Sequence, residues 1–275
     1  MRTTFLVLIL LLATYLLAQQ SDAVVSAGAP TILWSRTYGG PLPDWGNSVV
    51  QTSDGGYAIG GATGYGGECD FWLIKTDSTG NKQWDKTYGG SGTDEVARSV
   101  VQTSDGYAIV GCTNDPGVTS GGYDFWLVKT DSAGNMQWSQ HYGGTQDDES
   151  FSIVQTTDGG YAIAGYTQSF GGGFADFWLV RTDGYGNKQW NKTYGGFGYQ
   201  KAWCVVKTTD GGYAIAGGTN YPSYGFWVVK TDSLGNEQWN QTYDGADYNE
   251  AFSIVQTTDG GYAIAGITWP HGDTN

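Results

Sequence analysis

The stretch QTTDGGYAIAGYTQSFGGGFADFWLVRTDGYGNKQW, residues 155–190, decides the fold because close copies of it recur from Trp34 to the end of the chain. A Phe-Trp pair and a Gln-Trp pair each recur four times, and the aspartate that opens the Asp-Gly turn recurs five times, at intervals of 49 to 53 residues. A period of this length without a helical pattern is typical of a propeller blade, a four-stranded sheet that buries both faces only when neighbours stack against it. The five aspartates are Asp54, Asp105, Asp158, Asp210 and Asp259.

One repeat contains four short runs separated by turn residues. Residues 152–156 (SIVQT) and 161–165 (YAIAG) flank Thr-Asp-Gly-Gly, whose Asp-Gly dipeptide suits a tight hairpin. Residues 177–182 (FWLVRT) and 188–194 (KQWNKTY) flank a turn in which aspartate caps and glycine takes the left-handed conformation. The third run is almost wholly apolar, as expected of a strand covered on both faces. The sequence therefore predicts an all-β propeller of four-stranded antiparallel blades.

The strands do not fill a whole number of blades. Residues 31–40 (TILWSRTYGG) match the fourth strand of the repeat, and the fifth copy reaches Asn275 after only its second strand. A leading strand of this kind completes the last blade in many propellers, but here a third strand is missing between the two. We expect four complete repeats plus a partial fifth blade, in a ring that is unclosed or truncated, with an irregular last blade as the alternative. Exposed edges of an unclosed ring favour self-association.

Composition fits one propeller domain over residues 31–275. Glycine, at 45 of 275 residues, and aromatic residues, at 15%, are both abundant, as many turns and rings packed between sheets require. The net charge is −14 although only 15% of the residues are charged. No basic stripe is present to displace counterions from phosphates, so we expect no nucleic-acid partner. Cations and neutral polar ligands remain compatible with this charge.

The first 23 residues differ in kind from the repeats. Arg2 precedes an apolar run from Phe5 to Leu17, which is shorter than the roughly 20 residues of a membrane-spanning helix. Small residues follow at Ser21-Asp22-Ala23 and at 27–29, where a signal peptidase would cleave. We predict a secretory signal at 1–23, a linker at 24–30 and an extracellular or cell-surface location. An uncleaved anchor is the alternative and the only expected membrane contact. Glycosylation acceptors at Asn191 and Asn240 agree with export.

The sequence excludes several kinds of chemistry. Only two histidines are present, His141 and His271, so a site built from several imidazoles is excluded. No nucleophile elbow, phosphate loop or dinucleotide fingerprint occurs. The three cysteines occupy unrelated positions of the repeat, which indicates small buried residues more than a disulfide framework. A bridge between Cys69 and Cys112, in adjacent blades, stays open as an alternative. The third cysteine is Cys204.

Candidate binding residues gather in the loops that vary between copies. In a propeller these loops share one face, and variable loops on a rigid scaffold are where ligands usually bind. Carboxylates beside aromatic rings suit sugars, through ring stacking and hydrogen bonds, or Ca²⁺. No pair of carboxylates stands out as a catalytic pair. Loops before the first strand of a repeat hold Asp44, Trp45, Asp94, Glu95, Asp147, Asp148, Glu149, Tyr199, Trp203, Asp247, Tyr248 and Glu250. Loops between the second and third strands add Tyr65, Asp115, Phe170, Phe174, Tyr221, Tyr224 and Trp269.

The repeat as a whole resembles secreted β-propeller repeat proteins of archaea and bacteria. The likeness rests on Asp-Gly-Gly-Tyr-Ala-Ile-Ala-Gly, Phe-Trp-Leu-Val-Lys-Thr-Asp, Gly-Asn-x-x-Trp and Thr-Tyr-Gly-Gly, and it covers nearly all of residues 31–268. The hairpin at 80–84 (GNKQW) is also similar to the docking hairpin of pyrroloquinoline quinone propellers, whose tryptophans join neighbouring blades. That resemblance implies a structural role for Trp84, Trp138, Trp190 and Trp239.

The expected function is a secreted or cell-surface, non-enzymatic binding or adhesion module that takes a polysaccharide, a glycan or a surface protein. No cofactor is expected, apart from Ca²⁺ as an open alternative. The first rival hypothesis is a carbohydrate-active hydrolase or lyase that uses carboxylates of the same face. The second rival is a structural surface protein whose repeats serve assembly.

Overall fold

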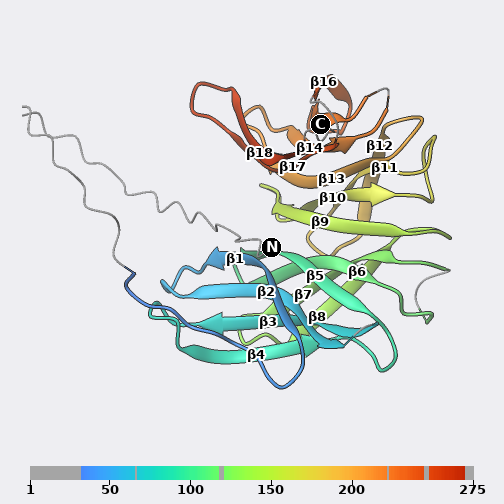
Figure 1. The fold of residues 1–275 in the computed structure, drawn as a ribbon. Helices are drawn as coiled ribbons and strands as arrows, with labels where there is room; N and C mark the ends of the chain where they lie inside the picture. The colour runs from blue at the N-terminus through green and yellow to red at the C-terminus, as the bar shows by residue number, and fades with distance from the viewer. Residues whose placement is uncertain (1–31, 66, 118–120, 222, 245–247, 270–275) are drawn as a thin grey trace, which may run out of the picture. The chain divides into compact units, whose positions relative to one another are not determined.

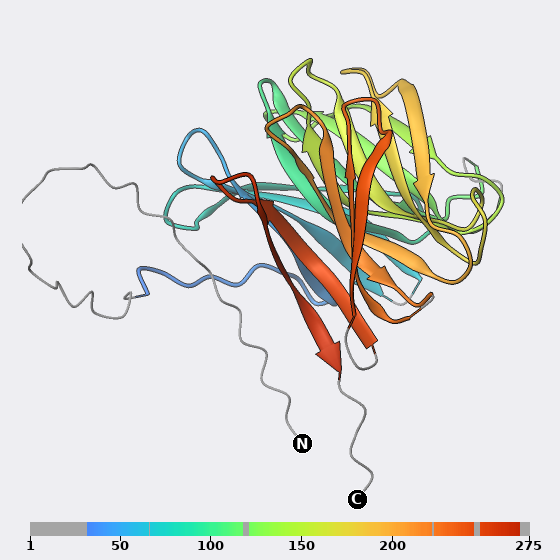
Figure 2. The same cartoon turned by 90° about the horizontal axis from the view of Figure 1, so that it is seen from above.

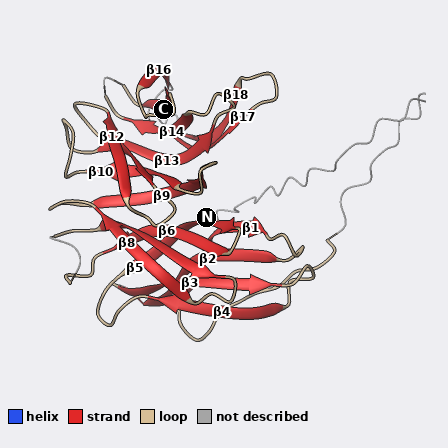
Figure 3. Cartoon of the chain, turned by 180° about the vertical axis from the view of Figure 1, so that it is seen from behind, coloured by secondary structure: helices blue, strands red, loops and turns tan. Residues whose placement is uncertain are grey.

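A computed structural model describes residues 32–65, 67–117, 121–221, 223–244 and 248–269. These described residues form eighteen strands and no helix (Figure 3), and all the strands belong to one compact unit, Trp34–Asn275. Within the described ranges, no helix exists that is long and apolar enough to cross a membrane. The strands are β1 (Asp44–Gln51), β2 (Tyr57–Tyr65), β3 (Glu68–Thr76), β4 (Lys82–Tyr88), β5 (Glu95–Thr103), β6 (Gly106–Thr113), β7 (Asp124–Asp131), β8 (Met136–Tyr142), β9 (Asp148–Gln155), β10 (Tyr161–Thr167), β11 (Asp176–Thr182), β12 (Lys188–Tyr194), β13 (Gln200–Lys207), β14 (Tyr213–Thr219), β15 (Gly225–Thr231), β16 (Glu237–Asp244), β17 (Tyr248–Gln256) and β18 (Tyr262–Trp269).

Each copy of the repeat forms its own antiparallel sheet. Four sheets have four strands in chain order, β1–β4, β5–β8, β9–β12 and β13–β16, and the fifth is the hairpin β17–β18. Strands of successive sheets pack together in chain order (Figure 1), and the hairpin lies against β13, β14 and β15 (Figure 2). The all-β class and the four-stranded antiparallel sheets are therefore as the sequence predicts.

Two details differ from the predicted strands. The first strand of each sheet begins earlier than expected, so that β9 starts at Asp148 and not at residue 152. Residues that looked like loop before this strand are therefore part of a ladder. Residues 32–40, predicted as a fourth strand, form no ladder with any described strand.

Every first strand carries a β-bulge at the same place. The pairing register of β1 with β2 skips from Gly46 to Ser48, and the other four first strands skip one residue at the equivalent position. A bulged residue has no partner in the ladder and increases the local twist of its strand. We call these five residues the bulge row: Asn47, Arg98, Phe151, Trp203 and Phe252.

The core consists of apolar side chains packed between neighbouring sheets. The phenylalanine of one third strand lies against the tryptophan of the next, with ring centroids 4.5 Å apart for Phe71 and Trp126. Phe125 with Trp178 and Phe177 with Trp227 repeat this contact at 4.6 Å. All three phenylalanines are fully buried. Full burial of each such side chain stabilises the fold by roughly 2 kcal/mol.

A second contact joins each fourth strand to the next sheet. Trp84 packs edge-on against Tyr107 at 5.8 Å and covers Gly134, where a β-carbon would lie 2.6 Å from the indole. Gly134 also has a φ of 76°, so two constraints select glycine there. The hydroxyl of Tyr88 donates to the Gly134 carbonyl at 2.7 Å. Trp138, Trp190 and Trp239 make the same edge-on contact with Tyr161, Tyr213 and Tyr262.

The Asp-Gly turns are held by ion pairs with the third strand. The buried Lys129 ammonium lies 2.7 Å from Asp105, and three other sheets have the same pair. The aspartate also accepts a hydrogen bond from the threonine two residues before it, as Thr103 donates to Asp105 at 2.9 Å. These interactions explain the invariance of the turn within the chain by structure alone. The other pairs are Lys75–Asp54, Arg181–Asp158 and Lys230–Asp210.

Candidate functional site

The structure divides the predicted binding residues into three groups. Of the residues predicted before the first strands, Asp94, Asp147 and Tyr199 lie in loops, whereas the others that are described begin or lie within first strands. Of the residues predicted between second and third strands, Tyr65 ends β2, and the following lie in loops: Asp115, Phe170, Phe174, Tyr221 and Tyr224. Asp247, and the side chains of Tyr248 and Trp269, fall outside the described residues. The expected loop position is therefore wrong for most of the residues predicted before the first strands, because these strands begin early. The residues that lie in strands are Asp44, Trp45, Glu95, Asp148, Glu149, Trp203 and Glu250.

Two predicted residues are buried between sheets. Glu95 is 1% exposed and Asp148 is 0% exposed, so neither presents its carboxylate at the surface. At Gly143 a β-carbon would lie 1.9 Å from Asp124 Oδ1 and 3.0 Å from Asp148 Oδ2, so both carboxylates lie close together beside this glycine. Asp70 and Glu95 lie together beside Gly89 in the same way, at 1.9 and 2.5 Å from the position of a β-carbon. Each pair joins the third strand of one sheet to the first strand of the next.

Burial changes the proton affinity of these pairs. Desolvation, reinforced by the Asp148 charge, raises the pKa of Asp124 to about 7, and desolvation also raises the pKa of Asp148. Asp148 Oδ2 accepts bonds from Gly144 N at 2.8 Å and Ser169 Oγ at 2.7 Å. Among the described residues, Oδ1 of both Asp124 and Asp148 lacks a hydrogen-bond partner. In the next interface Gln200 takes the place of Asp148, opposite Asp176. A neutral amide at this position indicates that each pair tolerates at most one charge.

Other predicted acids support loops. Asp94 Oδ2 accepts from the hydroxyl of Tyr123 at 2.8 Å, and Asp147 Oδ1 accepts from the Tyr123 backbone N–H at 3.0 Å. Asp44 Oδ2 accepts from the backbone N–H of Gly40 at 2.8 Å. These carboxylates order the backbone around them, which accounts for their presence without a ligand.

Glu149 and Trp203 belong to a cluster around the bulge row, and the other residues of this cluster were not predicted from the sequence. The rings of Phe151 and Trp203 are 4.2 Å apart, and the guanidinium of Arg98 lies 5.5 Å from the Phe151 centroid. Beside them Tyr166 donates its hydroxyl to Glu149 at 2.6 Å. Lys201 lies 4.2 Å above the Tyr166 ring. The signal that would have found this cluster is the variation of one position inside an otherwise repeated strand.

A second aromatic group lies on three interlocked loops. We define the loop platform as Phe174 of the β10–β11 loop, Phe197 and Tyr199 of the β12–β13 loop, and Tyr221 of the β14–β15 loop. The backbone N–H of Phe174 donates to the Gly198 carbonyl at 3.0 Å, which joins the first two loops. The backbone N–H of Tyr199 donates to Asn220 Oδ1 at 2.7 Å, which joins the second and third.

Buried side chains beneath the loop platform hold its loops in place. Asp176 Oδ2 accepts from Gly172 N at 2.7 Å, in the β10–β11 loop. Gln200 accepts from Gly196 N at 3.4 Å and donates to the Phe197 carbonyl at 3.0 Å, in the β12–β13 loop. Both side chains are nearly inaccessible to solvent. The rings above them are thus carried by backbone that is fixed from below.

The rings of the loop platform are exposed although they are large and apolar. Phe174 and Tyr199 stack nearly parallel, at 5.2 Å and 10°, and are 66% and 45% exposed. Phe197 and Tyr221 lie 6.1 Å apart and are 77% and 56% exposed. Phe174, Tyr199 and Tyr221 were singled out from the sequence, and Phe197 was not. Large exposed rings on fixed loops are the usual mark of a binding surface.

The structure also places the cysteines, the acceptor asparagines and the acidic residues. The three cysteines are free thiols, and burial raises the pKa of Cys112 and Cys204. Asn191 and Asn240 are exposed, and their Oδ1 atoms accept from the indoles of Trp178 and Trp227. In the ranges that the structure describes, no group of three or more His, Cys, Asp or Glu side chains is arranged to hold a metal ion.

Comparisons with known proteins add a likeness of fold. No protein-family model matches the sequence, and no curated protein is significantly similar to it. The structure is similar to the crystal structure of a protein of unknown function from Dyadobacter fermentans DSM 18053, with a TM-score of 0.56 and 11% sequence identity. That match covers 83% of this chain and 77% of the other. The similarity therefore concerns the fold alone.

Proposed function

We propose that the protein is a secreted β-propeller that binds carbohydrate without catalysis, and that the loop platform is its binding surface. The propeller arrangement is supported by the repeat period and by the regular packing of successive sheets. Export is supported by the apolar run after Arg2 and by the small residues that follow it. The observation that carries the binding proposal is the exposure of four aromatic rings on hydrogen-bonded loops.

Carbohydrate is the ligand class that this surface suits best. The stacked pair of Phe174 and Tyr199 offers an exposed, nearly planar apolar surface, against which the C–H face of a pyranose ring packs. The hydroxyl of Tyr199 and the polar groups of the neighbouring loops supply hydrogen bonds at the rim. The net charge of −14 favours a neutral saccharide over a phosphorylated one.

The proposal is tested by binding to neutral polysaccharides. We expect that the double variant Phe174→Ala with Tyr199→Ala weakens binding at least about tenfold, since each lost ring contact contributes roughly 0.5–1.5 kcal/mol. Affinity electrophoresis through gels that contain xylan, mannan or β-glucan measures this effect, and circular dichroism checks that the fold is retained.

The matched control is Tyr185→Ala. Tyr185 is 74% exposed and lies in the β11–β12 turn, at the opposite end of the same sheet from the platform. The proposal fails if Tyr185→Ala weakens binding as much as the double variant does, or if the double variant binds normally. Release of reducing sugar by the wild-type protein would contradict the proposal and support the rival hypothesis of a hydrolase.

A further inference from the structure

The bulge row forms a connected series of side chains across neighbouring sheets. First strands of successive sheets pack side by side in chain order (Figure 1). The ring centroids of Phe151 and Trp203 are 4.2 Å apart, and those of Trp203 and Phe252 are 5.7 Å apart. The guanidinium of Arg98 extends the series, at 5.5 Å from the Phe151 centroid. Four of the five bulged positions thus place one cation beside three aromatic rings.

Two members of this series have N–H groups without an acceptor. Nε of Arg98 and Nε1 of Trp203 are buried and lack a hydrogen-bond partner among the described residues. The Glu149 carboxylate is 3.9 Å from Nη2 of Arg98, which is longer than a hydrogen bond. The bulged Asn47, by contrast, donates from Nδ2 to the Ala97 carbonyl on the next first strand at 2.8 Å. A ligand that supplies acceptor oxygens would therefore be stabilised at Arg98 and Trp203.

Glu149 cannot supply these acceptors, because its own oxygens face other groups. Oε1 accepts from the hydroxyl of Tyr166 at 2.6 Å, and Oε2 accepts from the thiol of Cys112 at 4.0 Å. Lys201 lies 4.2 Å above the Tyr166 ring and forms no ion pair with a carboxylate in the described ranges. Two cations therefore stand beside one carboxylate, in a chain whose net charge is −14. We call these residues the cationic cluster: Arg98, Glu149, Phe151, Tyr166, Lys201 and Trp203.

The cationic cluster can be reached from solvent. The side chain of Arg98 is 35% exposed, and Phe151, Lys201 and Trp203 are each half-buried. Phe252, which continues the row of rings, is exposed. A ligand can thus contact an apolar ring surface beside a free guanidinium without disturbing the pairing of any strand.

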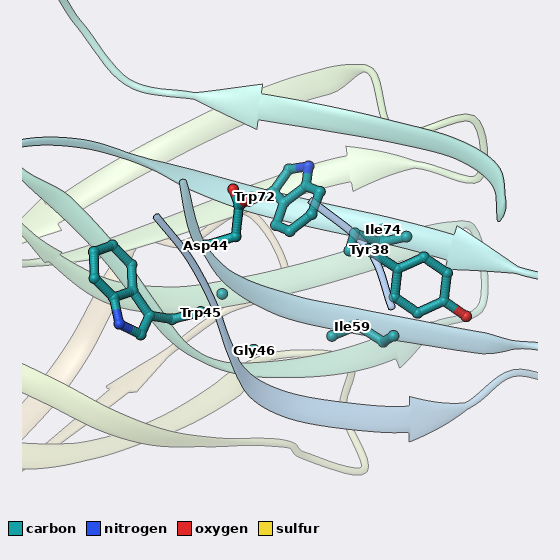
Figure 4. Close-up of a pocket in the computed structure, with 8 residues that line it drawn as sticks. Tyr38, Asp44, Trp45, Gly46, Ile59, Trp72 and Ile74 are labelled. Carbon is teal, nitrogen blue, oxygen red and sulfur yellow. The ribbon is translucent and has the colours of Figure 1, made fainter. Parts of the chain in front are cut away.

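The cavity beside β1 lacks this chemistry. It has a volume of about 80 Å³ and is lined in part by Trp45, which stands two residues before the bulge of its strand (Figure 4). Lys201 stands at the equivalent place in β13. Asp44 is the one charged residue among the eight that line the cavity, so a carboxylate would be repelled there. The positive charge is therefore a local property of the middle sheets.

We propose that the cationic cluster binds a carboxylate attached to a ring that has an apolar face. The guanidinium of Arg98 is a planar fork whose N–H groups match the two oxygens of a carboxylate. The ring of the ligand packs on Phe151 and Trp203, and Lys201 adds electrostatic attraction. A uronic acid residue of an acidic saccharide and an aromatic carboxylate share this chemistry. The site is separate from the loop platform, because its residues lie on first strands and on β10.

The first test is isothermal titration calorimetry of the full chain with trigalacturonate and, separately, with benzoate. We expect saturable binding of at least one of them, and this identifies the source of the carboxylate. The uncharged counterparts, methyl-esterified trigalacturonate and benzamide, bind at least about tenfold more weakly, because a charge-assisted hydrogen bond is lost. The proposal is overturned if neither acid binds, or if each acid binds no better than its uncharged counterpart.

Matched substitutions locate the site. Arg98→Gln weakens binding at least about tenfold, whereas Arg36→Gln, the same charge change at an exposed arginine outside the cluster, leaves it unchanged. Lys201→Gln weakens binding a few-fold at low salt and less at high salt, since its contribution is electrostatic. Lys207→Gln, at an exposed lysine on the same strand, is its control. Equal losses for Arg98→Gln and Arg36→Gln show a general effect of charge and overturn the assignment.

Thermal unfolding checks the fold of each variant. If Arg98→Gln does not fold, Arg98→Lys decides in its place, because it keeps the charge and loses the fork. We expect Arg98→Lys to weaken binding a few-fold or more, and wild-type affinity contradicts the role of the fork.

The two binding proposals fail separately. Arg98→Gln keeps its affinity for neutral polysaccharide if the loop platform binds it, because the platform contains no residue of the cationic cluster. Neutral polysaccharide binding without carboxylate binding refutes the cationic cluster alone. Carboxylate binding that is lost in the double variant Phe174→Ala with Tyr199→Ala assigns the acid to the platform and overturns the present proposal.

Discussion

The two ends of the sheets use aspartate in opposite ways. At the turn end, Asp158 is largely exposed, and hydrogen bonds from Thr156, with help from Arg181, lower its pKa to about 2. At the loop end, Asp124 is buried between sheets opposite a second carboxyl group, and its pKa rises to about 7. The same side chain is therefore an ion in one environment and close to half-protonated at neutral pH in the other. The comparison shows that the net charge of this protein is set by position as well as by composition.

Among the charged groups, the largest expected effect comes from neutralising a buried pair. Asp148→Asn removes the repulsion across Gly143, and we expect a gain of about 1–2 kcal/mol in the free energy of unfolding at pH 8. A carboxyl group whose pKa is raised in the folded protein stabilises the fold fully at pH values below its pKa in the unfolded chain, which is near 4. This stabilisation is lost as the pH rises through about 7, the pKa of Asp124 in the folded protein. At pH 5 the gain is therefore smaller, because Asp124 is protonated in the folded protein. Chemical denaturation at both pH values measures it.

The control for this substitution is Asp115→Asn, which makes the same charge change in a loop at the same end of the sheet. A similar gain for Asp115→Asn at pH 8 would show that net charge, and not the pair, is responsible. A loss of stability at pH 8 for Asp148→Asn would contradict the assignment of repulsion altogether.

An intermediate effect is expected at the turn end. Asp105→Ala leaves the buried ammonium of Lys129 with only hydrogen-bonding partners, the Thr130 carbonyl and Gln137. We expect a loss of about 1 kcal/mol, less than for a fully buried pair because Asp105 itself faces water. Thermal unfolding at pH 7 measures the loss.

Asp259→Ala is the matched control, because its turn has the same threonine hydrogen bond and, in the part of the chain that the structure describes, no cation within ion-pair distance. We expect a smaller loss than for Asp105→Ala. Equal losses for the two variants would assign the effect to the turn hydrogen bonds and leave no measurable contribution from the ion pair.

The smallest expected effect is on the loop platform. Phe197→Ser removes an exposed ring, so we expect a change of less than about 0.5 kcal/mol in the free energy of unfolding, while polysaccharide binding weakens. Phe177→Ala, at a fully buried position, is expected to lower the free energy of unfolding by about 3–5 kcal/mol. Urea titration of both variants compares them. A large loss for Phe197→Ser would move this ring from the binding surface to the core.

Much of the fold could be predicted because the repeat displays the same physical pattern several times. The Asp-Gly turns, the apolar third strands and the bounds of β12 follow directly from the residues. The start of the first strands was missed because polar residues such as Asp148 do not look like strand residues, although they pair with β10. Their burial depends on carboxyl groups brought from a neighbouring sheet, which no local pattern reveals.

A sequence signal for the buried pairs nevertheless exists. An aspartate stands directly before the Phe-Trp pair at Asp70, Asp124 and Asp176, and Gly225 replaces it in the fourth copy. For the platform, the sequence identified aromatic residues of the loops but could not show that Phe174 and Tyr199 stack. That contact joins two loops of neighbouring sheets and depends on their packing.

The bulge row has a consequence for how this scaffold acquires new specificities. Because a bulged residue makes no pair in its ladder, its identity is free of the alternation that fixes every other position of the strand. The chain already holds an amide, a guanidinium, an indole and two phenyl groups at these five equivalent positions without altering the pairing around them. A library of variants randomised at these five positions would therefore diversify five side chains on neighbouring strands. The hydrogen-bonded framework of the sheets would stay intact.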